Sequence, residues 1–147
     1  MVPERLRQAV DPILAWAERR PDLLAVALVG SWARGEARAD SDIDLVLLAN
    51  NPEVLRQDTS WHLDIAWGDA GLRPDEWRDV DYGAVWSRHV LLSPLMEVEL
   101  SFAEPSWAAL DPIDAGTRAV VANGFQILLD KTGLLARLQR SLQGVKR

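Results

Sequence analysis

Two aspartates separated by a single residue, Asp42 and Asp44, are the side chains best suited to chemistry in this sequence. They open an apolar run, Ile43–Ala49, that is typical of a buried strand. Residues i and i+2 of a strand lie on the same face, so both carboxylates can hold one divalent cation while Ile43 faces the core. A hard cation bound by one or two carboxylates and completed by substrate phosphates is the usual form of a Mg²⁺ site.

A Gly-Ser turn precedes these aspartates. Gly30 and Ser31 follow the apolar run Leu23–Val29, which predicts a second strand, buried on both faces. The residues after the turn have helical character, so backbone N–H groups there can face an anion. Ser31 is placed to hydrogen-bond a β- or γ-phosphate, and Arg34 can also reach a phosphate. Together with the aspartates, this turn predicts a site for a metal-bound nucleoside triphosphate.

A purely structural reading of the same residues stands beside this one. Gly30 can be an ordinary turn glycine, and the polar residues before the second strand can form a solvated turn. Asp44 discriminates between the readings because it lies in the approach to the apolar run 45–48, where a buried carboxylate without a partner costs free energy. Asp44 therefore favours the nucleotide-binding interpretation.

Three short segments also resemble a known family. They are GS at 30–31, ARGE at 33–36 and SDIDL at 41–45. This pattern resembles the signature of the DNA polymerase beta-type nucleotidyltransferase superfamily, and is nearest to the minimal nucleotidyltransferases and the aminoglycoside-type adenylyltransferases. The resemblance covers residues 26–49 and, more weakly, 85–138. It implies transfer of a nucleoside monophosphate, in the first instance AMP from Mg·ATP, to a hydroxyl, with pyrophosphate leaving and two Mg²⁺ ions taking part.

Two-metal phosphoryl chemistry needs one more carboxylate, as a metal ligand or general base. In the family that this chain resembles, that carboxylate lies on a strand beside the one that bears the aspartates. Glu97 and Glu99 both fall on the polar face of an alternating strand, Met96–Ala103. Glu99 is the preferred candidate because it lies deeper in the strand, whereas Glu97 suits a solvated edge. Asp64, in an alternating run at 61–67, is the reserve candidate. The resembled family often has an aspartate as this third carboxylate.

The remaining pattern predicts an α/β (α+β) fold: a mixed, mostly antiparallel sheet of about five strands with helices mainly on one face. Besides the elements above, the periodicity predicts helices over 3–20, 52–57, 105–110 and 114–122 and from 134 onward, strands over 61–67, 85–92 and 125–129, and a long loop over 68–83. Asn51 is expected to cap its helix. Pro12 can kink the first helix or start a second. Asn123-Gly124 reads as a helix C-cap or as a hairpin turn.

Most histidines and tryptophans are expected to have structural roles. His89 falls in a strand, where a packed or hydrogen-bonded role is expected. Of the seven tryptophans, Trp32 is the candidate for stacking on a nucleobase because it follows the Gly-Ser turn, whereas Trp16 and Trp107 are expected in the core. Lys131 is expected in solvent.

Length and charge bound the function. The 147 residues predict a single nucleotidyltransferase domain over 1–147, and the absence of cysteine excludes disulfides and thiolate metal sites. No signal-like or membrane-spanning apolar run is visible, so a cytoplasmic protein without membrane contact is expected. The net charge of −6 argues against a large nucleic-acid footprint but suits a metal-bound nucleotide and a cationic acceptor.

The acceptor is open at this point. It can be the hydroxyl of a small molecule such as an aminoglycoside, with a homodimer supplying the wall that larger relatives build from an added helical domain. It can also be a protein, because minimal members of the resembled family include antitoxins that adenylylate a partner toxin. A module that binds a nucleotide or a partner without catalysis is the third alternative. Catalysis is favoured if Glu99 or Glu97 faces the aspartates. Binding alone is favoured if both of them, and Asp64, point away.

Overall fold

The computed structural model describes residues 4–38, 41–83, 85–94 and 96–145. Its strands are β1 (Leu23–Val29), β2 (Ile43–Ala49), β3 (Arg73–Asp81), β4 (Trp86–Ser93), β5 (Met96–Ala103) and β6 (Phe125–Asp130). Its α-helices are α1 (Glu4–Arg19), α2 (Gly30–Arg34), α3 (Pro52–Gln57), α4 (Ala115–Ala122) and α5 (Leu134–Val145). Three 3₁₀ helices complete it: η1 (Trp61–Asp64), η2 (Trp67–Ala70) and η3 (Pro105–Ala108). Among the described helices, none is long and apolar enough to cross a bilayer.

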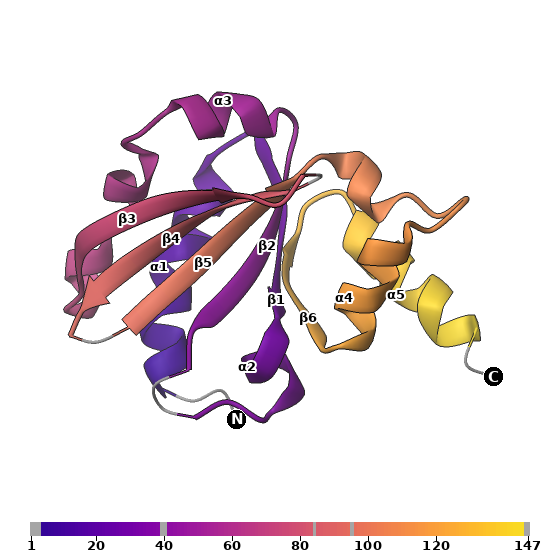
Figure 1. Ribbon diagram of the computed structural model, residues 1–147, viewed down its shortest axis with the longest axis horizontal. Helices are drawn as coiled ribbons and strands as arrows, with labels where there is room; N and C mark the ends of the chain where they lie inside the picture. The colour runs from indigo at the N-terminus through magenta and orange to yellow at the C-terminus, as the bar shows by residue number, and fades with distance from the viewer. Residues whose placement is uncertain (1–3, 39–40, 84, 95, 146–147) are drawn as a thin grey trace.

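A single sheet, in the order β3-β4-β5-β2-β1-β6, organises these elements (Figure 1). β2 and β5 run parallel, and every other neighbouring pair is antiparallel. The expected mixed, mostly antiparallel sheet is therefore confirmed, with six strands rather than about five. β1 and β2 lie near its centre, as continuous apolar runs require.

Helix α1 packs behind the sheet and forms the main core (Figure 1). Its buried residues recur at helical spacing: Leu6, Ala9, Val10, Ile13, Trp16 and Ala17. They meet the alternate residues of β1, β2 and β5 that face the same way. Pro12 lies inside one continuous helix, so neither a break nor a second helix forms there.

A smaller core covers part of the opposite face. Leu135 and Leu138 of α5 pack with Ala25 and Ala27 of β1, and partly buried residues of α4 and η3 border them. Helices thus lie on both faces, which refines the expectation of helices mainly on one. The second layer lies beside β6, and β2, β5 and β4 face the viewer uncovered by helices in Figure 1. That open surface carries the candidate site.

The C-terminal elements follow the helical reading. Asp114 caps α4 by accepting the amide of Thr117 at 3.1 Å, and α4 ends before Gly124, whose φ is +114°. The alternative hairpin at Asn123-Gly124 is therefore wrong. Lys131 is not idle in solvent, because its ammonium donates to two carbonyls at the C-terminus of α1, each at 2.9 Å.

The strand predicted over 61–67 is wrong. Two 3₁₀ helices, η1 and η2, occupy this region, with Trp61 and Trp67 buried and Leu63 58% exposed. The indole of Trp61 donates to the carbonyl of Leu55 at 2.8 Å, and the indole of Trp67 donates to that of His62 at 2.8 Å. These side-chain hydrogen bonds stabilise turns where the alternation of residue types suggested a strand. The side-chain cap predicted for Asn51 is also wrong, because Asn51 precedes α3 but its side chain makes no capping hydrogen bond.

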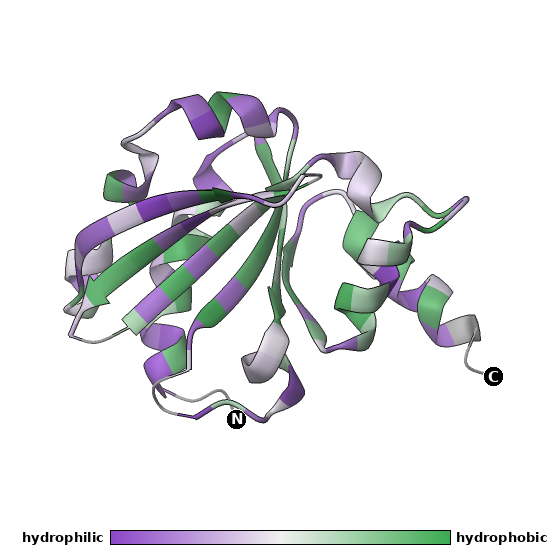
Figure 2. Ribbon diagram, in the orientation of Figure 1, coloured by the Kyte–Doolittle hydropathy of each residue, from purple (hydrophilic) through white to green (hydrophobic). Residues whose placement is uncertain are grey.

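The loop predicted over 68–83 is also wrong, because most of it is strand β3. Figure 2 shows β3 as mainly hydrophilic, whereas β5 alternates between hydrophilic and hydrophobic residues. β3 is an edge strand and is largely exposed, so it has no apolar alternation from which to predict it. Charged residues on an edge strand also oppose pairing with other chains.

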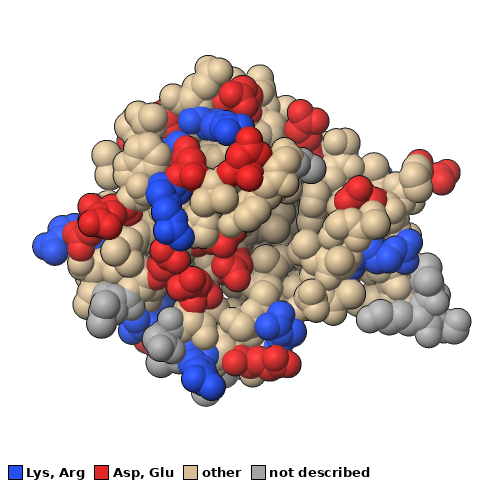
Figure 3. Space-filling model, in the orientation of Figure 1, with Lys and Arg blue, Asp and Glu red and all other residues tan. Residues whose placement is uncertain are grey.

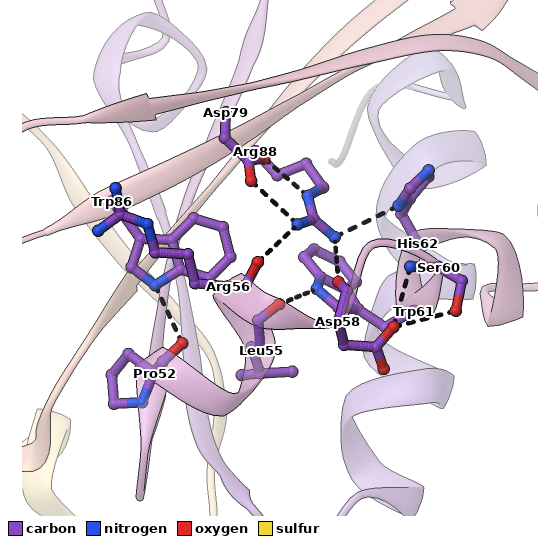
Figure 4. A network of polar contacts seen from close by, with 10 residues as sticks. All are labelled: Pro52, Leu55, Arg56, Asp58, Ser60, Trp61, His62, Asp79, Trp86 and Arg88. Carbon is purple, nitrogen blue, oxygen red and sulfur yellow. Dashed lines mark hydrogen bonds and ion pairs between the residues drawn. The ribbon is translucent and has the colours of Figure 1, made fainter.

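A buried arginine joins β3 to the rest of the protein (Figure 4). The side chain of Arg88, on β4, is fully buried, and its guanidinium binds both carboxylate oxygens of Asp79 at 2.7 and 3.0 Å. It also donates to the carbonyl of Asp58 at 2.8 Å. The rings of Trp61 and Trp77 lie 4.6 and 4.5 Å from its central carbon. Such a cation is held by a full set of partners, as a buried charge requires.

Candidate active site

One row of residues crosses five strands on the open face. The register pairs Val29 with Asp44, Asp44 with Glu99, Glu99 with His89, and His89 with Arg78. Partners in a ladder project to the same side of a sheet, and neighbouring strands lie about 4.8 Å apart, so the row extends over roughly 19 Å. The Gly-Ser turn adjoins its β1 end, and the edge strand β3 forms the other.

Four carboxylates gather in the middle of this row. The Asp44 carboxyl lies within hydrogen-bonding reach of Glu99, and the Asp42 carboxyl within reach of Glu97. Figure 3 shows the acidic side chains together on the open face over β2 and β5. The structure therefore brings together Asp42, Asp44 and both glutamates, while Asp64 lies in η1 and is not among the groups that act on Asp44. The charge of this reserve candidate acts instead on Arg20 and His62, so Asp64 is not part of the cluster.

The electrostatics of the cluster are unfavourable in the absence of a cation. Burial, and next the negative charges of Glu99 and Asp42, raise the pKa of Asp44 to about 7. Burial and the hydrogen bond with Asp42 raise the pKa of Glu97. Like-charged carboxylates in a partly desolvated site cannot all ionise without cost. Perturbed groups in a shared surface of this kind are typical of functional sites.

The donor set suits a hard divalent cation. All four side chains offer carboxylate oxygens, which Mg²⁺ prefers, and a cation would relieve the repulsion that raises two of the pKa values. The carboxylates face one another in pairs, and across the described residues no three His, Cys, Asp or Glu side chains already enclose a metal position. The residues fit such a cation in the chemistry of their donor atoms.

Gly30 makes the close approach of β1 to Asp44 possible. Its φ is +74°, and a Cβ atom added there would lie 2.7 Å from Oδ2 of Asp44. Any other residue would be strained and would push the carboxylate away. Gly30 is therefore more than an ordinary turn glycine, because its contact with Asp44 joins the Gly-Ser turn to the acidic cluster.

We expect Gly30→Ala to weaken binding of a Mg·ATP analogue at least tenfold, as measured by calorimetry, because Asp44 is displaced. Gly35→Ala is the matched control: Gly35 also has a φ of +74°, but an added Cβ meets nothing within 4 Å. Both variants bear a backbone cost of about 1–3 kcal/mol. Equal loss of binding in the two variants would contradict the role of the Gly30–Asp44 contact.

The other residues predicted to bind nucleotide lie around the same turn. Ser31 lies in the first turn of α2 and is half-buried. Arg34 donates to the carbonyl of Asn123 at 2.9 Å and contacts Glu36 at 3.4 Å, so its guanidinium already ties α2 to the α4–β6 turn. The indole of Trp32 donates to the carbonyl of Ser41 at 3.2 Å and packs against the main core. These contacts leave Trp32 poorly suited to the predicted stacking on a base.

Sequence reasoning missed the residues on the β3 side of the cluster. Arg78 lies beside Glu97 and His89 around a small cavity of about 180 Å³. Tyr82, 57% exposed, follows β3, and burial and the charge of Glu99 raise the pKa of its phenol. Only the pairing of β3 with β4 places these side chains here, so no local pattern reveals them. A larger cavity, of about 730 Å³ between α1 and η2, has none of the four clustered carboxylates in its lining.

An acidic cluster on neighbouring strands, joined to a Gly-Ser turn in a mixed sheet, defines a nucleotidyltransferase-type site. The family model of the nucleotidyltransferase domain matches residues 13–101, more than half of the chain. The chain therefore belongs to the nucleotidyltransferase domain family, and nucleotidyl transfer is the activity of that class. A comparison with curated proteins finds no match.

Among solved structures, the chain is similar to an aminoglycoside 6-adenyltransferase from Bacillus subtilis. The TM-score is 0.52 at 16% identity, over 74% of this chain and 37% of the other. At this identity the likeness concerns the fold alone. The chain thus corresponds to little more than a third of that larger protein.

Proposed function

We propose that this protein transfers AMP from Mg·ATP to a hydroxyl group and releases pyrophosphate. The observation that carries the proposal is the register that sets Glu99 of β5 directly beside Asp44 of β2. Asp42, Asp44 and Glu99 are the proposed metal ligands, and Mg²⁺ supplies charge stabilisation at the transferring phosphoryl group when bound. A third carboxylate beside the aspartate pair favours catalysis over a module that only binds.

The direction of the row suggests where each substrate lies. We place the triphosphate at the β1 end, with Gly30 and Ser31 as contacts and Arg34 beside them. In an in-line displacement the attacking and leaving oxygens lie on opposite sides of the phosphorus. Pyrophosphate then leaves toward β1, and the acceptor hydroxyl approaches from β4 and β3, where Arg78 and Tyr82 lie.

The proposed step forms one phosphorus–oxygen bond and breaks another, and residues of the site accept the proton that is released. The acceptor oxygen forms a bond to the α-phosphorus while the bond from that phosphorus to the α–β bridging oxygen breaks. Pyrophosphate takes the electron pair, and the proton of the hydroxyl passes to the carboxylate of Glu99. As in phosphoryl transfer generally, the chain contributes mainly position and electrostatic stabilisation.

The acceptor remains a choice between two classes. The open acceptor side suits a protein hydroxyl, as in antitoxin-type adenylyltransferases that act on a partner toxin. The net charge of −6 suits a cationic small molecule, for which a homodimer could complete the site. We also propose that 1–147 forms a single domain, which the pairing of β6 with β1 supports.

Calorimetric titration with a non-hydrolysable ATP analogue tests the proposed site. We expect binding in the presence of Mg²⁺ and none after chelation, with at least a tenfold loss in Asp42→Asn. Asp64→Asn is the matched control, because this exposed carboxylate lies outside the cluster and its loss should leave binding unchanged. Binding that persists with a chelator, or in Asp42→Asn at full strength, would refute the proposed site.

A further inference from the structure

His89 lies buried between two glutamates without a hydrogen bond. Its Nδ1 is 3.8 Å from a carboxylate oxygen of Glu97, and its Nε2 is 3.8 Å from one of Glu99. The residue is 8% exposed, and neither ring nitrogen has a hydrogen-bond partner. The expectation of a packed or hydrogen-bonded histidine is therefore met by packing. This histidine is packed, but it is not hydrogen-bonded.

An unpaired buried nitrogen is costly. Leaving a buried donor or acceptor unsatisfied typically costs about 1–3 kcal/mol, and this ring has two such nitrogens. Normal N–H···O bonds measure about 2.7–3.2 Å, so a carboxylate shift of less than about 1 Å would complete one. A small movement of either glutamate would therefore give His89 a hydrogen bond on that side of the ring.

The two glutamates are not equivalent from the side of His89. One oxygen of Glu99 already accepts from the hydroxyl of Ser101 at 3.4 Å, and its other oxygen faces His89. Glu97 contacts Asp42 and lies near Arg78. The Nδ1 side of the ring therefore faces Glu97, and the Nε2 side faces Glu99.

We propose that His89 is a positioning residue that selects the third metal-binding carboxylate. A ring N–H completes a hydrogen bond to one glutamate when the carboxylates close around a divalent cation, and so holds that glutamate in its binding orientation. The inference rests on the proposed function. It adds a specific residue, on a third strand, that acts through a ligand without touching the metal, as partners of metal ligands commonly do.

Three substitutions of His89 separate the possibilities. His89→Leu removes both nitrogens, His89→Gln keeps an amide N–H near the position of Nε2, and His89→Asn keeps one near Nδ1. The measurements are Mn²⁺ affinity by calorimetry without nucleotide, and the melting temperature of the metal-free protein. We expect His89→Leu to weaken Mn²⁺ binding 10- to 100-fold. We expect its metal-free melting temperature to be unchanged or higher, because no hydrogen bond is lost.

The two amide variants identify the ligand. Recovery of Mn²⁺ binding in His89→Gln assigns Glu99, and recovery in His89→Asn assigns Glu97. Recovery in neither overturns the proposal, as does wild-type affinity in His89→Leu. A fall in the metal-free melting temperature that accompanies the loss of binding also overturns it, because a merely structural histidine would behave so.

His62 provides the matched control. It is also buried with a nitrogen, Nε2, that lacks a hydrogen-bond partner, but it lies beside Arg88, and the carboxylates that act on it are Asp58, Asp64 and Asp79 rather than those of the cluster. His62→Gln should leave Mn²⁺ affinity unchanged, and a loss there equal to that of His89→Leu would overturn the proposal. Failure of the wild-type protein to bind Mn²⁺ would instead refute the proposed metal site, and this inference with it.

Discussion

Replacing Asp44 by asparagine is expected to abolish nucleotidyl transfer while stabilising the metal-free protein above pH 7. The loss of one carboxylate from the cluster should lower pyrophosphate release from ATP roughly 10³-fold, the scale of removing one stabilising group from a preorganised site. Asparagine keeps the size of the side chain and removes the charge that opposes Glu99 and Asp42.

The effect on stability follows from proton linkage. The folded-state pKa of Asp44 is about 7, above its ordinary value of 3.8, so between these pH values the folded protein binds more protons than the unfolded chain. The free energy of unfolding therefore falls as the pH rises from 4 to 7 and then levels off. Because the carboxyl still touches water, we expect this fall to be about 2 kcal/mol, part of the full value of about 1.4 kcal/mol per pKa unit.

Denaturant unfolding at pH 5 and pH 8 measures this contribution. In Asp44→Asn the difference between the two pH values should shrink, and Glu97 should maintain a smaller slope because its pKa is raised too. Adding Mg²⁺ at pH 8 should stabilise the wild-type protein and have little effect on the variant. A variant that is less stable than wild type at pH 8 would show that Asp44 is a structural residue.

Arg88→Met is expected to be the most destabilising substitution that conserves approximate side-chain size. It leaves Asp79 without its partner and removes the donor to the carbonyl of Asp58. Removing one member of a buried ion pair typically costs about 3–5 kcal/mol. For a chain of this size, we expect a fall in melting temperature of about 10 °C. Arg88→Lys should recover little, since an ammonium lacks the two-pronged geometry that binds both oxygens of Asp79.

The exposed pair Arg56–Asp81 gives a matched comparison. Its atoms lie 3.0 Å apart, but both side chains are at least 40% exposed, so Arg56→Met should cost no more than about 1 kcal/mol. Urea titration measures both variants. If the two arginines prove equally dispensable, the buried network does not hold β3 to β4. Under conditions in which Arg88→Met remains folded, it should weaken Mn²⁺ binding only modestly. Arg88 and His89 are consecutive in β4, so their side chains lie on opposite faces of the sheet.

The local sequence pattern predicted strands correctly wherever their burial was uniform or alternating. The bounds predicted for Leu23–Val29, Ile43–Ala49 and Met96–Ala103 are those observed, because fully buried strands carry unbroken apolar runs and half-buried ones alternate. It failed over residues 61–81. There, indole hydrogen bonds stabilise two 3₁₀ helices, and an exposed edge strand depends on its neighbour for pairing.

The sequence by itself determined the family, the mixed sheet and the aspartate pair, because the Gly-Ser turn and the DxD spacing are contained within one strand–turn–strand unit. Only the tertiary structure decided which other side chains join that unit. The parallel pairing of β2 with β5 brings Glu97 and Glu99 to the aspartates, and the pairing of β4 and β3 adds His89 and Arg78. Strand register is a property of long-range packing, so no local spacing encodes that row of side chains.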